Sequence, residues 1–344
     1  MLKTSKSAKF LRLAMFSALF AFLMILIGAY AHISDAGLGC PDWPGCYGRL
    51  FAPTTAQELN ETRLYAPRAT DEEAKAWKDT LHRYVSGSLG LLMFRLLYLG
   101  WQLKKRYRKQ QVIIPAMVFL LVFSQTILGA LTIKLQFKPL IMMSHLITGL
   151  SILGLLWWVA LREQRFWKPV SAAAPVLADL RPRAFIGLVL VMVQLVLGGW
   201  NSANYAALAC PDFPTCRGVW WPNMDFVDGF VLWQDLGFAY EGGMLTLAAS
   251  TAVHMAHRIG AMVTFIYIGW LGLHTMRIGY ESNLCRYGFL VLVLVSGQMF
   301  LGAANVLLHL PIILGVLHTG LAALLLLGII TLNHAVRPRK LSGA

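Results

Sequence analysis

Two stretches of the chain, 170 residues apart, are near copies of each other. Residues 37–46 read GLGCPDWPGC and residues 207–216 read ALACPDFPTC. Shorter matches at offsets of 173 to 175 are His82-Arg83 with His257-Arg258, His145 with His318, and QTILG at 125–129 with QMFLG at 298–302. The chain is therefore a tandem duplication, and each half carries one Cys pair and two histidines in helical segments.

The composition places the fold in a lipid bilayer. Hydrophobic residues make up 57% of the chain and charged residues 13%, which is far from the usage of a soluble domain. Eight apolar runs reach the roughly 20 residues needed to cross a bilayer. The predicted helices are 10–32, 80–101, 111–134, 138–161, 184–204, 246–274, 286–307 and 311–333. We predict an all-α integral membrane protein with eight transmembrane helices, four in each half.

The net charge of +14 is distributed unevenly between the two faces of this arrangement. The face that holds both termini has 19 basic residues against three acidic ones, whereas 33–79, 134–138 and 205–245 together have eight basic and 13 acidic residues. By the positive-inside rule both termini are cytoplasmic and the two Cys-bearing loops are on the outer side. We expect the membrane to be a bacterial inner membrane, with these loops in the periplasm. This distribution argues for topology and against nucleic-acid binding.

An even number of helices in each repeat returns the chain to its starting side. The two halves should therefore be two four-helix bundles related by a pseudo-two-fold axis along the membrane normal. The basic segment before the fifth helix contains Pro169, Pro175 and Pro182 and reads as the connection. We expect an N-terminal half at 1–165, a cytoplasmic linker at 166–183 and a C-terminal half at 184–344.

Each half offers two histidines from two different helices, near the side on which the Cys loops lie. His82 and His145 form the first pair, and His257 and His318 form the second. Ionisable side chains inside a bilayer are costly and mark functional sites. Two imidazoles that face each other across a bundle predict ligation of a haem iron. A structural zinc site is disfavoured, since it takes four ligands.

Each pair has polar neighbours whose roles the sequence leaves open. Arg83 and Arg258, directly after a histidine, could bind haem propionates or extend to the membrane interface. Three residues before His82 the first half has Asp79, either a catalytic base or electrostatic group at the haem edge, or an N-terminal helix cap. The second half has His254 there, which is a partner of the site, part of an electron path or a structural core residue.

Four of the five cysteines lie in the two matched outer loops. Cys40 and Cys46, and likewise Cys210 and Cys216, are each separated by five residues, so two disulfides are expected in an oxidising compartment. Each would act as a structural clamp or exchange with a thiol partner. Cys285, on the other face, is expected to be a free thiol. The long outer loops are expected to cover the two sites.

The duplicated halves, the GLGCPDWPGC motif, and one histidine in each of the second, fourth, sixth and eighth helices resemble the heme A synthases, over about residues 10–335. The resemblance implies oxidation of the C8 methyl group of heme O to a formyl group, giving heme A for cytochrome oxidase. It implies substrate haem between His82 and His145, and a haem b between His257 and His318 that relays electrons. Asp79 stands where the family usually has glutamate, one methylene longer.

The resemblance also implies partners. These are heme O synthase as the donor of the substrate, cytochrome oxidase or its assembly factors as the recipient, and an electron acceptor that the sequence does not identify. A homo-oligomer is compatible with the many small helix-packing residues. Two other functions remain open from the residues alone: a bis-haem cytochrome b that carries electrons, and a haem transporter or chaperone without chemistry.

Overall fold

The computed structural model describes residues 5–34, 40, 42–52, 73–104, 110–135, 138–163, 172–233, 245–280 and 282–337. Within these ranges the chain is helical, and its only β-type pairings are two isolated bridges, one in each Cys loop. The long helices are α1 (Ser5–Ile33), α3 (Glu73–Lys104), α4 (Gln110–Lys134), α5 (Pro139–Glu163), α6 (Ala174–Ala203), α8 (Leu247–Ile278), α9 (Leu284–Leu307) and α10 (Ile312–Ala335). Two short helices, η1 (Ala206–Leu208) and α7 (Phe226–Gly229), lie between α6 and α8.

Seven of the long helices are long and apolar enough to cross a membrane, namely α1, α4, α5, α6, α8, α9 and α10. The predicted count of eight spans is therefore confirmed for seven. The remaining long helix, α3, has 32 residues but carries Arg95 within its apolar stretch and a polar first turn. Ser86 and Ser88 lower its hydropathy further.

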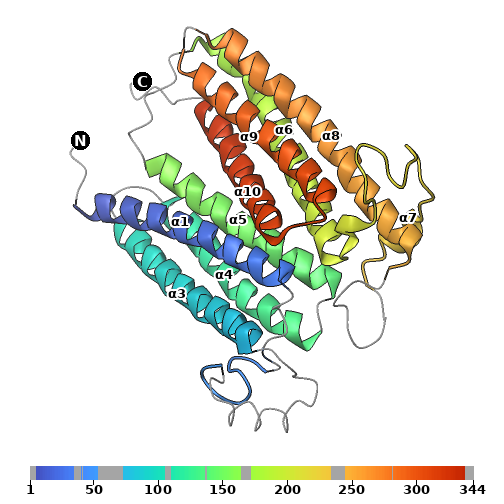
Figure 1. The fold of residues 1–344 in the computed structure, drawn as a ribbon. Coiled ribbons are helices and arrows are strands. Elements are labelled where there is room, and N and C mark those ends of the chain that lie inside the picture. The colour runs from blue at the N-terminus through green and yellow to red at the C-terminus, as the bar shows by residue number, and fades with distance from the viewer. Residues whose placement is uncertain are drawn as a thin grey trace.

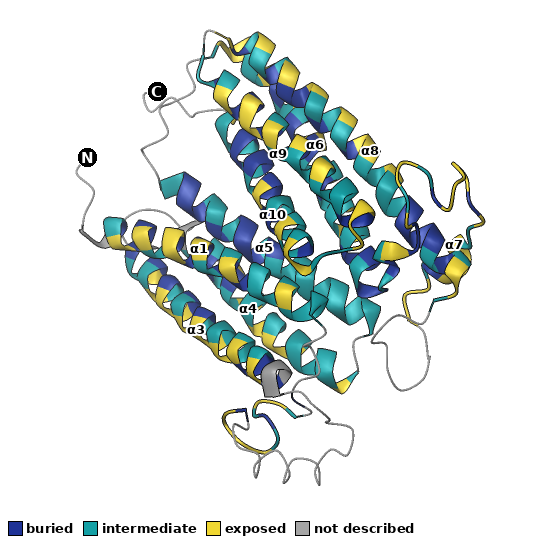
Figure 2. Cartoon of the chain, viewed as in Figure 1, coloured by how far each residue is buried: buried dark blue, intermediate teal, exposed yellow. Residues whose placement is uncertain are grey.

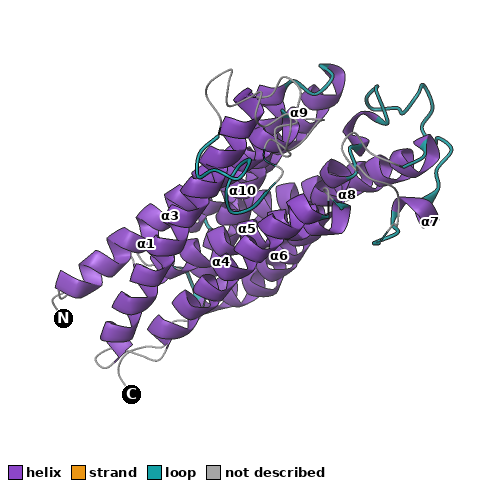
Figure 3. Ribbon diagram, turned by 90° about the horizontal axis from the view of Figure 1, so that it is seen from below, coloured by secondary structure: helices purple, strands orange, loops and turns teal. Residues whose placement is uncertain are grey.

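The helices of each half pack in the same order. In the first half α1 and α4 each contact both α3 and α5, and in the second half α6 and α9 each contact both α8 and α10. Between the halves, α1 contacts α10 and α5 contacts α6 and α10. Figures 1 and 3 show the two groups of helices side by side, with their axes running in similar directions.

The two halves share one apolar core. It includes Ala18 of α1, Leu153 of α5, Ala184 of α6 and Ile329 of α10, all at most 4% exposed. Glycines allow close approach between the halves, because a Cβ on Gly154 would lie 3.0 Å from Ile330 Cδ1. Many large apolar residues of the helices are exposed, which suits contact with lipid. Figure 2 shows exposed positions along the outer faces of the helices.

The two largest differences from the predicted helix boundaries are at the starts of α3 and α6. The helix α3 begins at Glu73, seven residues before the predicted start, because 73–79 (EAKAWKD) is polar yet rich in strong helix formers. The helix α6 begins at Ala174, so the second part of the predicted linker 166–183 is helical. Pro175 suits its first turn, where a missing N–H costs no hydrogen bond.

The start of α1 and the end of α10 lie at one end of the molecule, and both Cys loops lie at the opposite end (Figure 1). Of the long outer connections that were expected to cover the two sites, 53–72 and 234–244 fall outside the described residues. The described part of these connections consists mainly of the two disulfide loops and the short helices η1 and α7.

Candidate functional site

All four predicted haem-ligand histidines lie in the first three turns of their helices, toward the end of the molecule that bears the Cys loops. His82 is the tenth residue of α3 and His257 the eleventh of α8, while His145 and His318 are the seventh residues of α5 and α10. At 1.5 Å per residue, the partners in each half sit at comparable depths.

The structure brings each predicted pair together. His82 and His145 are near enough to interact electrostatically, and so are His257 and His318. These pairs come from α3 with α5 and from α8 with α10, so each pair joins two helices of one half. The arrangement provides two separate two-imidazole sites, one per half.

Each histidine lies against a glycine of a neighbouring helix. A Cβ on Gly28 would lie 3.4 Å from His82 Nε2, and one on Gly198 would lie 3.1 Å from His257 Cε1. The other two contacts are Gly129 with His145 Cε1 at 3.7 Å and Gly302 with His318 Cε1 at 3.2 Å. Glycine at these four positions lets the imidazoles enter the space between helices.

Glutamines from the repeated QxxLG segments also contact the histidines of α5 and α10. Gln125 Nε2 donates to the carbonyl oxygen of His145 at 2.8 Å, and Gln298 Nε2 lies 3.2 Å from His318 Nε2. Sequence analysis recognised these segments as repeats but missed their contact with the histidines. The signal was available, since both the glutamine and the glycine of QxxLG recur at the same offset as the histidine.

Buried polar atoms without a partner gather around the two sites. Among the described residues, the ring Nδ1 atoms of His145 and His318 are buried without a hydrogen bond, and so are the Oε1 atoms of Gln125, Gln194 and Gln298. Buried polar atoms normally have a partner, so these mark places where a ligand group or water belongs. The described residues hold no cluster of three or more His, Cys, Asp or Glu side chains. Paired imidazoles between glycine-lined helices therefore fit a haem.

Two further glycines near His318 serve packing between the halves. Gly315 and Gly320 of α10 face Ile33 and Leu26 of α1, across the boundary between the halves. Gly87 is exposed and has no neighbouring heavy atom within 4 Å of a Cβ built on it. Gly315 and Gly320 thus allow close packing of α10 against α1, whereas Gly87 packs against no other helix in the described residues.

Both predicted disulfides are formed in the structure. Cys40 joins Cys46 and Cys210 joins Cys216, with the four side chains at most 1% exposed. Cys285 is a free, partly buried thiol. In each loop an aspartate accepts hydrogen bonds from the two backbone amides that follow the second cysteine: Asp42 from Tyr47 and Gly48, and Asp212 from Arg217 and Gly218.

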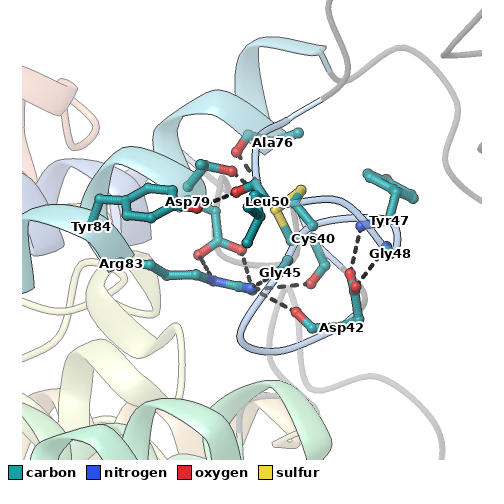
Figure 4. Close-up of a disulfide and its surroundings, with 12 residues drawn as sticks. Cys40, Asp42, Gly45, Tyr47, Gly48, Leu50, Ala76, Asp79, Arg83 and Tyr84 are labelled. Atoms are coloured by element: carbon teal, nitrogen blue, oxygen red, sulfur yellow. Dashed lines mark hydrogen bonds and ion pairs between the residues drawn. A yellow bond between two sulfur atoms is a disulfide. The ribbon is translucent and has the colours of Figure 1, made fainter. Parts of the chain in front are cut away.

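Arg83 ties the first Cys loop to α3 (Figure 4). Its Nε and Nη2 donate to the two carboxylate oxygens of Asp79, at 3.0 and 2.9 Å. Its Nη1 donates to the carbonyls of Asp42 and Gly45, and Nη2 also donates to the carbonyl of Cys40. All five N–H donors of the guanidinium are thus engaged.

The position of Asp79 excludes one of its two predicted roles. Because α3 begins at Glu73, Asp79 lies in the second turn and is not the N-terminal cap, so that alternative was wrong. The carboxylate is nearly buried and is bonded through both oxygens to Arg83, whose side chain is 12% exposed. The buried acid next to His82 is therefore part of an ion pair.

Arg258 occupies the same place in the second half, with a neutral partner. Its Nε donates to His254 Nε2 at 2.8 Å, and His254 Nδ1 lies 2.9 Å from the carbonyl of Ala206. The remaining donors bind loop carbonyls, namely those of Thr215 at 2.8 Å, Cys210 at 3.0 Å and Asp212 at 2.7 Å. His254 is thus a bridge between Arg258 and η1, and a haem propionate would compete with loop carbonyls for either arginine.

The second loop should loosen in acid. Hydrogen bonds from Thr215 Oγ1 and the Gly218 amide lower the pKa of Asp212 to about 2. Because an unfolded aspartate titrates near 3.9, this carboxylate stabilises the loop above about pH 4 and loses that effect as the pH falls toward 2. We expect reduction of the buried Cys210–Cys216 disulfide by a phosphine reductant to accelerate over this range.

The matched variant for this prediction is Asp212→Asn, which cannot titrate. In this variant the Cys210–Cys216 disulfide should be reduced faster at pH 6 than in the unaltered chain. Its reduction rate should change little as the pH is lowered further. An unaltered chain whose reduction rate stays flat between pH 5 and pH 2 would contradict a role for the Asp212 carboxylate in holding the loop.

Comparison with known proteins gives a consistent result. The family model described as COX15-CtaA, cytochrome oxidase assembly protein, matches residues 11–330. The chain is 39% identical over 315 residues to a heme A synthase of Shewanella oneidensis, covering 92% of this chain and 93% of that protein. It is 27% identical to a heme A synthase of Shouchella clausii, covering 91% and 92%, and 25% identical to one of Sinorhizobium medicae, covering 95% and 89%. With two glycine-lined histidine pairs and a match along nearly its whole length, the chain belongs to the COX15-CtaA family of cytochrome oxidase assembly proteins.

Proposed function

We propose that this protein is a heme A synthase, an integral membrane oxidoreductase that oxidises the C8 methyl group of heme O to a formyl group. The observation that carries the proposal is the occurrence of two separate histidine pairs, one per half, in a chain whose relatives are named heme A synthases. The product, heme A, would supply cytochrome oxidase, in line with the family description.

The two halves would divide the work. His82 and His145 would bind the substrate haem in the half at 1–165, and His257 and His318 would bind a resident haem b in the half at 184–344. Haem iron, when bound, exchanges single electrons, so the second site can accept electrons from the first and pass them to an acceptor. Because the two sites lie at comparable depth, electrons would pass between them parallel to the membrane plane.

The unequal partners of the two arginines support this division. The first half has an Asp79–Arg83 ion pair where the second has the neutral contact of His254 with Arg258. Beside a substrate that would develop positive charge, the Asp79 carboxylate adds one negative charge that offsets Arg83, whereas His254 adds none to offset Arg258. We infer that Asp79 contributes this charge while Arg83 holds the carboxylate and the loop in place.

The proposed topology follows from the charge distribution. All eight long helices, α3 included, would cross the membrane as two four-helix bundles related by a pseudo-two-fold axis along its normal. Both termini would be cytoplasmic and the two Cys loops periplasmic, in the inner membrane. Heme O would arrive from heme O synthase, and heme A would leave to cytochrome oxidase or its assembly factors.

The test is to purify the protein after co-expression with a heme O supply, extract its haems and identify them by chromatography and mass spectrometry. We expect haem b together with heme A or a hydroxylated heme O. Unmodified haem b alone, filling both sites, would overturn the proposal in favour of an electron-carrying cytochrome. Unaltered heme O that exchanges freely with added haem would favour a transporter.

A further inference from the structure

The histidines of α3 and α8 differ in their side-chain partners. The carboxamide nitrogen of Gln194, on α6, lies 3.0 Å from His257 Nδ1 and 3.1 Å from the carbonyl oxygen of His257. In the first half, no side chain in the described ranges makes a recorded hydrogen bond to the His82 ring. In the described residues, the His257 ring therefore has a side-chain partner that the His82 ring lacks.

The repeat shows what replaces Gln194 in the first half. The offset of 170 that relates Gly28 to Gly198 also relates Met24 to Gln194. In each half this residue lies one helical turn before the glycine that contacts the histidine. Met24 is buried, at 8% exposure, and its thioether is a weak acceptor without a donor.

A second difference makes room for the glutamine. A Cβ on Gly260 would lie 2.4 Å from Gln194 Oε1, closer than real Cβ contacts, and 2.7 Å from Leu197 Cδ1. Gly260 is three residues after His257, and the position three residues after His82 is Val85. The second half thus has Gln194 and Gly260 beside its histidine. The corresponding residues of the first half are Met24 and Val85.

The two imidazoles also turn different edges toward their glycines. A Cβ on Gly28 would lie nearest to Nε2 and Cδ2 of His82, whereas one on Gly198 would lie nearest to Cε1 and Nδ1 of His257, with Nε2 next at 3.9 Å. The ring edge that carries Nδ1 in His257 is the edge that Gln194 contacts. The glutamine and the ring orientation therefore belong to one arrangement, in which Gln194 contacts Nδ1 of His257 rather than Nε2.

We propose that Gln194, admitted by Gly260, is a positioning residue that fixes the His257 imidazole and makes the second haem site electronically different from the first. The inference rests on the proposed binding of haem by His257 and His318. With iron on Nε2, His257 carries its proton on Nδ1 and donates it to Gln194 Oε1, a buried oxygen without a partner in the described residues. To accept this proton the carboxamide would turn about its last side-chain bond, exchanging the hydrogen bond that Nε2 donates to the His257 carbonyl for one from the ring.

A hydrogen bond from Nδ1 has a defined effect on an iron-binding imidazole. It raises the basicity of the ligand, fixes the ring and stabilises the more positive oxidation state of the metal. The haem held by His257 should therefore have a lower reduction potential, and be retained more firmly, than the same ligands would give without Gln194. Met24 provides no such bond at His82.

The experiment uses the purified haem-loaded protein and titrates its haem b by visible spectroscopy against potential. Gln194→Met, which installs the residue found in the first half, should raise the midpoint potential. It should also weaken haem retention about 10- to 100-fold, the usual effect of losing an outer partner of a metal ligand. Gln194→Glu, equal in size but with a carboxylate acceptor, should shift the potential in the opposite direction.

Two further variants separate the outcomes. Gly260→Ala should displace the carboxamide and so reproduce the shift in haem b potential seen in Gln194→Met. Combining Gly260→Ala with Gln194→Met should shift the potential little more than either substitution alone. Met24→Leu, the counterpart in the first half, should leave the haem b potential unchanged. If haem b depends on His257 but Gln194→Met and Gln194→Glu both leave its potential unchanged, the inference fails. If haem b does not depend on His257, the proposed function fails instead.

Discussion

Replacing His82 by alanine is expected to abolish production of heme A while leaving haem b bound. The imidazole of His82 belongs to the pair in the first half, and alanine removes one of the only two ligands that the pair offers. Haem b, for which we propose His257 and His318 as ligands, should not depend on it. Extraction of haems from the purified variant should give haem b in amounts near those of the unaltered protein and no heme A.

Replacing His257 by alanine should have a different effect. Haem b should be selectively depleted, because His318 alone is left in the second half and loss of one axial ligand weakens iron binding. Product should also fall, since electrons from the first site would lose their relay. The readout is the ratio of haem b to protein, together with heme A and hydroxylated heme O in the extract.

His274→Ala is the matched control for both variants. His274 also lies on α8, but it is hydrogen-bonded to Asp179 at 3.0 Å and belongs to neither pair. Its loss should leave both haem b and heme A unchanged. The division of labour would be contradicted if His82→Ala depleted haem b and His257→Ala spared it, or if either variant behaved like the control.

The second large effect is expected at Arg83. Arg83→Ala leaves the carboxylate of Asp79 nearly buried with no cation, and it also frees three loop carbonyls. Removing one partner of a buried ion pair costs about 3–5 kcal/mol. We expect a markedly lower apparent melting temperature in detergent and faster reduction of the Cys40–Cys46 disulfide.

Two comparisons isolate the cause. Arg258→Ala should be milder, at about 1–3 kcal/mol, because it leaves the neutral His254 and backbone carbonyls unsatisfied but strands no charge. The double variant Asp79→Ala, Arg83→Ala should recover part of the stability lost in Arg83→Ala. Equal losses for Arg83→Ala and Arg258→Ala, or no recovery in the double variant, would show that the ion pair is not what holds the first loop.

Much of the fold was predictable because bilayer physics acts on each segment separately. An apolar run of about 20 residues must be helical to satisfy its own backbone, so seven spans and most helix ends followed from composition. Local polarity misled at two boundaries. The polar segment 73–79 gave no apolar signal, and Pro175 and Pro182 suggested a linker, yet 73–79 is helical and both prolines lie within α6.

The duplication also identified the four histidines, the two arginines and the two Cys pairs, because each recurs at nearly the same offset. The sequence by itself therefore determined which segments are helices and which polar residues occur once in each half. Such information is local or depends on repetition, and neither requires knowing which side chains meet.

Only the tertiary structure decided the partners. It paired Asp79 with Arg83, engaged both arginines with loop carbonyls and placed Gln194 against His257 in a space left by Gly260. Apart from the Asp79–Arg83 pair, which lies within α3, these contacts join a helix to a loop or to another helix distant in sequence, and they depend on the rotation of each helix about its axis and on the volume that neighbours leave. That rotation is fixed by packing of the whole bundle, so no single segment encodes it.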